Sequence, residues 1–310
     1  MGVLNRLPPD TEGGTLSVFA DWEGAVPRPT GPTIARWQLA GELKTLRESA
    51  GITHLDIAEV LGCSDSKIYK IESGDVGINR GDLLVMIDRY HVTDERVRDT
   101  LLSLQKQGKE RGWWAKFGQL PNAYGMYIGL ESAATAVRNF ELAVIPGLLQ
   151  TEDYARTIIQ AQRVSDKADE IERRVKVRLA RQACLTEDPP LMFWTIIDEG
   201  ALHRQTGGKA VMRAQLEHLI EVNKLPNVTI QVLPFTEGTH PGTLGSIAIL
   251  EFPEEVHSPV AYIETYAGDV YLEREDDIRR TTLTYTHLHA AALSASKSSE
   301  LIAAIARQLA

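Results

Sequence analysis

Cysteine is scarce in this sequence, since its 310 residues include only Cys63 and Cys184. Two cysteines are too few for a disulfide framework and exclude a zinc site built from cysteine ligands. No apolar run approaches the roughly 20 residues that a membrane-spanning helix needs. The first residues also lack the basic stretch and the apolar core of a secretory signal. We therefore expect a soluble, cytoplasmic protein with no membrane partner.

Positive charge is in short supply as well, because the formal net charge is −9 and the sequence pI is about 5.5. Residues 33–110 hold 11 Lys and Arg against 13 Asp and Glu. Proteins that bind nucleic acids use Lys and Arg to neutralise phosphates, so this balance counts against tight binding. It does not exclude binding, because only the face that meets the nucleic acid has to be favourable.

The length and composition suggest two domains behind a flexible lead-in. Hydrophobic content of 43% and charged content of 24% are ordinary for globular proteins and allow a proper core. Residues 1–32 contain five prolines and five glycines without sustained periodicity, which is typical of a flexible segment. We expect a mainly α domain over residues 33–110 and an α+β domain over residues 111–310.

Residues 33–110 show the start and stop signals of successive short helices. The apolar stripe of the first helix consists of Leu39, Leu43, Leu46 and Ala50. The signals that begin the following helices are Thr53 with Asp56, Ser64, Asn79 with Asp82, and Thr93. Glycines end three of the helices, at positions 51, 62 and 74. Five capped helices with short loops predict a compact bundle.

The pair of short helices between Thr53 and Ser73 carries the most specific signal. Ala58 is small enough to let two helices cross closely, and Gly62 permits the tight turn between them. The characteristic segments are Leu43-Lys-x-Leu-Arg47, Gly51-Ile-Thr53, Ile57-Ala-x-x-Leu-Gly-x-Ser64 and Ile68-x-x-Ile-Glu-x-Gly74. Together they resemble the Xre/Cro class of phage-repressor helix-turn-helix proteins over roughly residues 36–91. The alternative is a helical bundle without this specialisation.

The resemblance implies a recognition helix over residues 65–73 that enters the major groove of DNA. Its candidate base or phosphate contacts are Ser64, Asp65, Ser66, Lys67 and Lys70. Lys67 is the candidate for guanine, whereas Asp65 is better explained as an acid favoured by the helix dipole. The preceding helix usually begins with a Gln that bonds a phosphate. This chain has His54 there, after Thr53, which is primarily a cap.

Basic residues outside the two helices are further candidates for contacts to the DNA backbone. These are Arg36, Lys44 and Arg80, although each is more often a solvated charge. The resemblance also implies a buried ion pair between Arg47 and Glu72 that joins the first and third helices. Cys63 precedes the recognition helix and has no cysteine nearby, so it is better explained as a small structural residue than as a redox switch.

The rest of the chain mixes helices and strands. Helices are expected over residues 131–140, 151–160, 166–186, 209–223, 275–293 and 298–309. Strands are expected over residues 191–197, 228–233, 245–252, 260–265 and 270–273, between Pro and Gly turns. Strands clustered between helical blocks favour an α+β domain with an antiparallel sheet.

This second region resembles the long C-terminal domain of unknown function that follows helix-turn-helix units in actinobacterial regulators. The most specific piece is Pro146-Gly-Leu-Leu-Gln-Thr-x-x-Tyr-Ala155, and Asp198-Glu-Gly-Ala-Leu-His-Arg204 is a further matching segment. The resemblance implies regulation and a small partner protein encoded nearby, but no chemistry. In physical terms, Pro146 and Gly147 set a turn, the two leucines after them pack, and Thr151 caps the next helix.

Five polar residues of this region are candidates for lining a pocket that binds a small-molecule effector. They are Glu131, Glu199, His203, His240 and Glu264, and the first is also explained as a satisfied polar group. His287-x-His289 lacks a third ligand and places its side chains on different helical faces, so no metal site is predicted. No phosphate loop, nucleophile elbow or zinc-protease motif is present, which argues against an enzyme and a cofactor.

We predict a sequence-specific transcription regulator, such as a repressor, that binds double-stranded DNA as a homodimer. One recognition helix reads only a few base pairs, so two half-sites increase selectivity. Leu301, Ile302 and Ile305 are candidates for the dimer contact. Two alternatives stay open: an interaction adaptor whose helix-turn-helix has lost DNA binding, and a second domain that binds or converts a small molecule.

Overall fold

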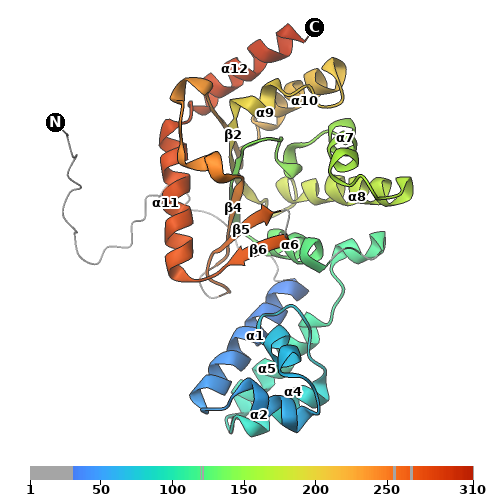
Figure 1. Ribbon diagram of the computed structural model, residues 1–310, viewed down its shortest axis with the longest axis vertical. Helices are drawn as coiled ribbons and strands as arrows, with labels where there is room; N and C mark the ends of the chain where they lie inside the picture. The colour runs from blue at the N-terminus through green and yellow to red at the C-terminus, as the bar shows by residue number, and fades with distance from the viewer. Residues whose placement is uncertain (1–30, 119, 121, 254–255, 266–267, 310) are drawn as a thin grey trace, which may run out of the picture.

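The computed structural model describes residues 31–118, 120, 122–253, 256–265 and 268–309. It has two parts, a helical bundle from α1 to α5 and a larger C-terminal part in which helices cover a sheet. Figure 1 shows the bundle at one end of the molecule, with the sheet and its helices beyond it. The predicted fold class is therefore confirmed. The predicted lead-in, residues 1–32, lies outside the described residues except for Gly31 and Pro32.

The bundle follows the predicted capping signals closely. Its helices are α1 (Pro32–Ser49), α2 (His54–Leu61), α3 (Asp65–Glu72), α4 (Arg80–Arg89) and α5 (Glu95–Gly108). Thr53, Ser64 and Asn79 stand at the predicted N-caps, and each side chain accepts a backbone hydrogen bond from the first turn of its helix. The last helix departs from the prediction, because Asp94 and not Thr93 caps it.

The bundle has an apolar core to which every one of these helices contributes. Its most deeply buried members, each 0 or 1% exposed, are Leu43, Ile57, Ile68, Leu83, Met86, Ile87 and Leu101. Burial of one such side chain contributes about 1.5–3 kcal/mol. Isolated helices of eight residues are not stable in water. Packing against this core therefore holds α2 and α3 in place.

The C-terminal part alternates helices and strands. Its helices are α6 (Asn122–Ala133), α7 (Glu152–Gln162), α8 (Ala168–Arg181), α9 (Glu199–His203), α10 (Lys209–Val222), α11 (Glu275–Ala291) and α12 (Ala295–Gln308). Its strands are β1 (Ala136–Glu141), β2 (Met192–Asp198), β3 (Val228–Leu233), β4 (Ile247–Glu251), β5 (Val260–Thr265) and β6 (Gly268–Leu272). Short 3-10 helices are η2 (Trp113–Phe117), η3 (Gly147–Leu149), η4 (Gln182–Leu185), η5 (Phe235–Glu237) and η6 (Pro241–Leu244).

The described strands form a mixed sheet in the order β3-β2-β1-β4-β5-β6. β1, β2 and β3 are parallel, because helical crossovers connect them. β4, β5 and β6 are antiparallel, as predicted. The sheet is therefore mixed rather than antiparallel throughout. Helix α11 covers one face, and α6, α7, α10 and α12 pack into the core on the other (Figure 1).

Strand β1 lies in the middle of the sheet, where the sequence predicted a helix over residues 131–140. The helix α6 instead ends at Ala133, and the chain turns directly into the strand. Two polar residues interrupt the apolar pattern that is expected of a central strand, and both have partners on neighbouring strands. Arg138 Nη2 lies 2.9 Å from Glu251 Oε1 on β4, and Asn139 Oδ1 accepts a hydrogen bond of 3.0 Å from Thr195 Oγ1 on β2. These partners make a polar central strand stable.

Helix α1 contributes to both cores. Its first half supplies Ile34 and Trp37 to the core of the C-terminal part, and its second half supplies Leu39 and Leu43 to the bundle core. Because a helix bends only gently over its length, α1 fixes how the bundle is placed relative to the C-terminal part. The two parts are therefore joined by a shared structural element as well as by the connection after α5.

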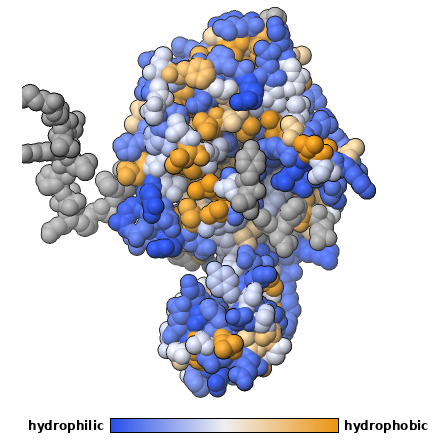
Figure 2. Space-filling model, in the orientation of Figure 1, coloured by the Kyte–Doolittle hydropathy of each residue, from blue (hydrophilic) through white to orange (hydrophobic). Residues whose placement is uncertain are grey.

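Close contacts fix α1 against the C-terminal part. A Cβ atom added at Gly129 of α6 would overlap Oγ1 of Thr33, so the two helices meet at this glycine. Gln38 Nε2 donates to the Val256 carbonyl at 2.5 Å. The rings of Trp37 and Tyr271 meet edge to face with centroids 5.8 Å apart. Figure 2 shows the narrow neck at which the bundle joins the larger part.

The last helix completes the apolar core of the C-terminal part. Ile302 and Ile305 are 1% and 3% exposed and belong to that core, and Leu301 is partly buried against it. The prediction that these residues form a dimer contact is therefore wrong for both isoleucines, since their own chain covers them. No helix within the described residues is both long enough and apolar enough to span a membrane.

Candidate nucleic-acid interface

Capping residues determine the tight turn between α2 and α3. Thr53 and Asp56 form a reciprocal capping box at the start of α2, as predicted. The Thr53 hydroxyl also donates to Asp56 Oδ2 at 2.7 Å, and these hydrogen bonds lower the pKa of Asp56. Gly62 ends α2 with φ 62° and ψ 38°, a left-handed conformation that costs other residues about 1–2 kcal/mol. Ser64 then caps α3 two residues later.

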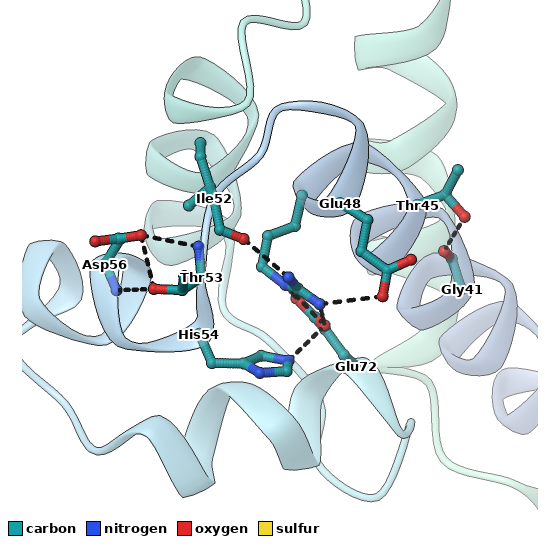
Figure 3. A network of polar contacts seen from close by, with 9 residues as sticks. Gly41, Thr45, Glu48, Ile52, Thr53, His54, Asp56 and Glu72 are labelled. Atoms are coloured by element: carbon teal, nitrogen blue, oxygen red, sulfur yellow. Dashed lines mark hydrogen bonds and ion pairs between the residues drawn. The ribbon is translucent and has the colours of Figure 1, made fainter.

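A buried ion pair anchors α3 to α1 (Figure 3). Arg47 Nε lies 2.8 and 3.1 Å from the two carboxylate oxygens of Glu72, and Arg47 Nη2 lies 3.0 Å from Glu72 Oε2. The two side chains are 8% and 3% exposed, and Arg47 Nη1 also donates to the Ile52 carbonyl at 2.9 Å. The Arg47–Glu72 pair predicted from the family resemblance is thereby confirmed. It ties both ends of the helix-turn-helix to the first helix.

His54 joins this network from the start of α2. Its Nε2 lies 2.9 Å from Glu72 Oε2, and its ring lies 6.2 Å from the ring of Tyr69 on α3. Its side chain is 37% exposed, so the imidazole links the interior pair to the surface. The Nε2 atom of His54 is occupied within the protein and is not directed to a ligand.

The outward edge of α3 is open to solvent. Ser66, Tyr69 and Lys70 are exposed there, while Ile68 and Ile71 point into the bundle core. Tyr69 is 64% exposed, and the sequence analysis did not select it. The sequence pattern could have indicated this exposure. Tyr69 lies between two isoleucines of the core, and a residue next to a core residue on a helix points outward. A large aromatic side chain held in solvent at this edge is a candidate for direct contact with a base or a sugar.

The acid and the lysine in the first turns of α3 both have partners in the protein. Asp65 Oδ1 accepts a hydrogen bond from Ser66 N at 2.7 Å, as expected for an acid at the start of a helix. Lys67 Nζ lies 3.1 Å from Asp82 Oδ2 on α4, with side chains that are 42% and 25% exposed. Lys67, the predicted guanine contact, is therefore paired before any DNA is bound.

The three basic residues predicted to contact the DNA backbone lie in different places. Arg80 is exposed in the first turn of α4, two residues before the Asp82 that pairs with α3. Lys44 is exposed on α1 near Glu273 of the C-terminal part. Burial raises the pKa of Glu273, and the positive charge of Lys44 opposes this rise. Arg36 is half-buried where α1 meets the C-terminal part. Arg80 lies two residues from the Asp82 that pairs with α3, and Arg36 lines a cleft together with Lys70 of α3.

Two family models match the chain. One, described as a helix-turn-helix domain, matches residues 38–101, which include α2, the turn and α3. The other, described as a domain of unknown function (DUF5753), matches residues 124–304, which is more than half of the chain. The chain belongs to the DUF5753 family. No curated protein and no solved structure matches it.

The helix-turn-helix match indicates DNA binding and transcription regulation, and it favours a regulator over an enzyme. The resemblance noted from the sequence is confirmed at this level, as a helix-turn-helix domain followed by a domain of unknown function. The DUF5753 match begins inside α6 and runs to α12, so it covers the whole mixed sheet.

Glu131 of the DUF5753 domain is part of a second buried ion pair. Its carboxylate accepts hydrogen bonds of 2.8 and 2.7 Å from Arg181 Nε and Nη2, and the two side chains are 3% and 6% exposed. The Arg181 guanidinium also lies over the rings of Tyr124 and Tyr127, at 5.7 and 5.1 Å. The ion pair accounts for the buried acid on α6, which is thus a satisfied polar group.

The other candidates for a ligand pocket do not form one group. Glu199 accepts a hydrogen bond from the backbone of the loop after β3 at 2.7 Å and lies 3.1 Å from His203 Nε2. His240 Nε2 lies 3.4 Å from Asp198 Oδ2 at the end of β2, whereas Glu264 is exposed on β5. These contacts hold the loop after β3 against β2. Among the described residues, no three His, Cys, Asp or Glu side chains are grouped to hold a metal ion.

The segment Pro146–Thr151 is held by glutamines from two helices. Gln182 Nε2 donates to the Gln150 carbonyl at 2.6 Å, and Gln215 Nε2 donates to the Leu149 carbonyl at 2.7 Å. Leu149 is fully buried, so the predicted packing of this segment is confirmed. Thr151 stands at the N-cap of α7, but its side chain makes no capping hydrogen bond, which corrects the prediction. Its backbone N donates to Gln215 Oε1 instead.

Proposed function

We propose that the chain is a sequence-specific DNA-binding transcription regulator of the Xre/Cro type known from actinobacteria. In this proposal residues 33–110 bind DNA through α3, and residues 111–310 regulate that binding. The observation that carries the proposal is the geometry of α2, the Gly62 turn and α3. The Arg47–Glu72 pair supports this unit from inside, while the edge of α3 stays in solvent. The major groove admits an α-helix, and the support from inside leaves the exposed edge of α3 free to enter it.

Ser66, Tyr69 and Lys70 are the proposed contacts to DNA on this edge. A serine hydroxyl and a lysine amine bond base edges or phosphates, and an aromatic ring packs against a sugar or a thymine methyl group. Lys67 is a further proposed contact, in which its amine leaves Asp82 and bonds an acceptor on the DNA. An exposed ion pair of this kind contributes only about 0–1 kcal/mol, so the exchange costs little.

Residues at the helix starts are proposed to position the protein on the phosphates. Thr53 and Ser64 lie at the N-termini of α2 and α3, where backbone N–H groups favour an anion, whereas the carboxylate of Asp65 would repel a phosphate. Arg80 lies at the start of α4, two residues from the Asp82 that pairs with α3. Contacts of this type set the register of the protein on the duplex but do not specify sequence.

Selection of bound sequences from random DNA with the full chain tests the proposal. We expect one short motif to be enriched. Lys70→Ala should then weaken binding to that motif and reduce the slope of log affinity against log salt by about 0.9. The matched control is Lys209→Ala, which removes the same charge from an exposed site at the start of α10. Equal effects of the two variants, or no enriched motif, would contradict the proposal.

Base preference requires a separate measurement. Tyr69→Ala should change the selected motif at one or two positions, with a loss of about 1–3 kcal/mol for the original sequence. Tyr69→Phe keeps the ring and serves as the control for the hydroxyl. If Tyr69→Ala selects the same motif with the same affinity, the exposed edge of α3 does not read bases.

An interaction adaptor is the second candidate function, and the charges of the bundle favour it. Lys67 is paired with Asp82, and Asp56 and Asp65 add negative charge to α2 and α3. Binding of the proposed small partner protein would then use the same exposed edge. Stoichiometric binding of that partner, lost in Tyr69→Ala, together with an absence of salt-dependent DNA binding, would support the adaptor over the regulator.

We also propose that the chain acts as a homodimer. One copy of α3 covers only a few base pairs, and two copies on half-sites one helical turn apart multiply the selectivity. The contact lies outside Ile302 and Ile305, because both are buried in their own chain. Sedimentation equilibrium of the complex should give two chains per selected site. One chain bound to an unrepeated motif would contradict the dimer and leave DNA binding intact.

A further inference from the structure

A cleft of about 840 Å³ lies where the bundle meets the DUF5753 domain. One wall comes from α1 and from the end of α3 with the turn after it. The other wall comes from η2, α6 and β6. Sites for small molecules commonly have volumes of roughly 300–1,000 Å³, so this cleft has the size of such a site. None of the five pocket residues suggested by the sequence lines it.

Three basic side chains line the cleft, and among the described residues none of them has an ion-pair partner. They are Arg36 on α1, Lys70 on α3 and Arg111 after α5. The Nε of Arg36 is shielded from solvent and has no hydrogen-bond partner within the described part of the chain. Burial lowers the pKa of Arg36, and the charge of Asp75 opposes this effect. A buried donor without a partner costs free energy, and an acceptor on a ligand would recover it once the Arg36 side chain turns this donor into the cleft.

The cleft also has acidic side chains, but two of the three are engaged by their own domain. Asp75 accepts a hydrogen bond from Ser73 Oγ at 2.9 Å, and Asp269 accepts one from Tyr262 OH at 2.9 Å. The third, Glu110, is exposed. The oxygens of Asp75 and Asp269 are thus engaged by neutral hydroxyls, whereas the Nε donor of Arg36 has no acceptor in the described part of the chain. The unsatisfied donor favours a ligand that supplies an acceptor such as an oxyanion.

Aromatic side chains form part of the walls beside these donors. The Trp114 ring lies against two glycines of α6, since a Cβ atom at Gly125 would be 3.4 Å from its Nε1 and one at Gly129 would be 3.0 Å from its outer ring. Tyr271 of β6 also lines the cleft and packs edge to face on Trp37. Two aromatic side chains near an anion site suit a planar ring.

We propose that this cleft binds a small-molecule effector with a carboxylate or phosphate group attached to a planar ring. The oxyanion accepts from Arg36, Arg111 and Lys70, and the ring packs against Trp114. The proposal rests on the regulator function proposed above and assigns its effector site. Lys70 belongs to α3, so the occupant touches the proposed recognition helix directly.

Trp37 gives the cleft a second connection to α3. Gly74 follows α3, and a Cβ atom there would overlap Cδ1 of Trp37, so the indole packs directly on this turn. The same indole contacts Tyr271 from the cleft wall. A ligand that moves Tyr271 therefore acts on the end of α3 through one side chain. Binding in the cleft and binding of DNA are coupled by this contact and by Lys70.

The test is a fluorescence titration of the full chain with anilinonaphthalene sulfonate, an anion on planar rings. We expect one saturable site. Arg36→Gln and Arg111→Gln should each weaken it by about tenfold, the loss of one charge-assisted hydrogen bond. Lys209→Gln, which changes an exposed charge outside the cleft, should leave affinity unchanged. Arg111 is exposed, so its variant stays informative even if Arg36→Gln does not fold. Absence of saturable binding, or equal affinity in all variants, would overturn the proposal.

Competition defines the anionic group. We expect the bound probe to be displaced by adenosine monophosphate but not adenosine, or by salicylate but not salicylamide. The first pair identifies a phosphate and the second a carboxylate. Displacement by the neutral members equally well, or by neither anion, would overturn the assignment of an oxyanion site.

The regulatory step is measured on the selected DNA. Saturating the cleft with the displacing anion should change DNA affinity by about fivefold or more in the parent chain and not in Arg111→Gln. Unchanged DNA affinity with the cleft occupied would overturn the effector role. The titrations need no DNA and the DNA selection needs no ligand, so failure of the effector site and failure of the regulator function are distinguishable.

Discussion

Replacing Glu72 by Gln should destabilise the bundle far more than the same change at Glu48, although both acids contact Arg47. The Glu72 side chain is 3% exposed and receives three N–H···O contacts from Arg47 and one from His54. Gln keeps its shape but removes the charge and turns an amide donor toward the guanidinium. Breaking a buried ion pair by changing one partner costs about 3–5 kcal/mol, because it leaves the other charge buried alone.

Glu48 supplies the matched control. Its carboxylate is 57% exposed and lies 3.5 Å from Arg47 Nη2, so Glu48→Gln should cost no more than about 1 kcal/mol. Urea denaturation followed by circular dichroism measures both losses, and amide hydrogen exchange of residues 54–72 shows whether they fall on α2 and α3. We expect a difference of at least about 2 kcal/mol between the variants. Equal losses would refute the view that this pair supports the recognition helix.

Three further perturbations test other parts of the structure. Gly62→Ala should destabilise the bundle by about 1 kcal/mol from the left-handed conformation alone, since a Cβ atom there meets nothing within 4 Å. Gly41→Ala within α1 should stabilise it, and a urea series that shows the reverse order would reject the turn geometry. Burial raises the pKa of Glu141 from 4.5 to about 7, so the folded chain holds a proton that the unfolded chain releases between these values. Stability should therefore fall as pH rises through this window, by about 1–3 kcal/mol, and urea midpoints at about pH 5 and pH 8 should differ much less in Glu141→Gln. Gly129→Ala should push α1 from α6 at Thr33, with a loss of about 1–3 kcal/mol and faster hydrogen exchange in residues 33–37; unchanged exchange there would show that the helices do not meet at this glycine.

The bundle could be predicted from the sequence because its signals are local. Thr53, Gly62 and Ser64 act on the backbone within three or four residues, and such caps identify helix ends without knowledge of the fold. Strand β1 could not be predicted in this way. Arg138 and Asn139 make its pattern polar, and their partners on β2 and β4 are 56 or more residues away in the chain. Only tertiary pairing shows that these residues fit a central strand.

The candidate interface also has features that the sequence predicts and features that depend on tertiary packing. The Arg47–Glu72 pair follows from the resemblance to a known class, and the exposure of Tyr69 follows from helical phase between Ile68 and Ile71. The pairing of Lys67 with α4 depends on where other helices pack, which no local pattern reports. The inward position of Arg36 depends on how α1 meets the second domain.

Cross-linking from the edge of α3 to DNA tests the central claim most directly. A photoreactive benzoylphenylalanine placed at Tyr69 in the full chain is bound to the selected DNA and irradiated, and the modified nucleotide is mapped. We predict cross-links to bases inside the selected motif, and none from the same group placed at Leu283, which is exposed on α11. DNA that is bound without cross-linking from position 69, or that cross-links equally from position 283, would contradict the account.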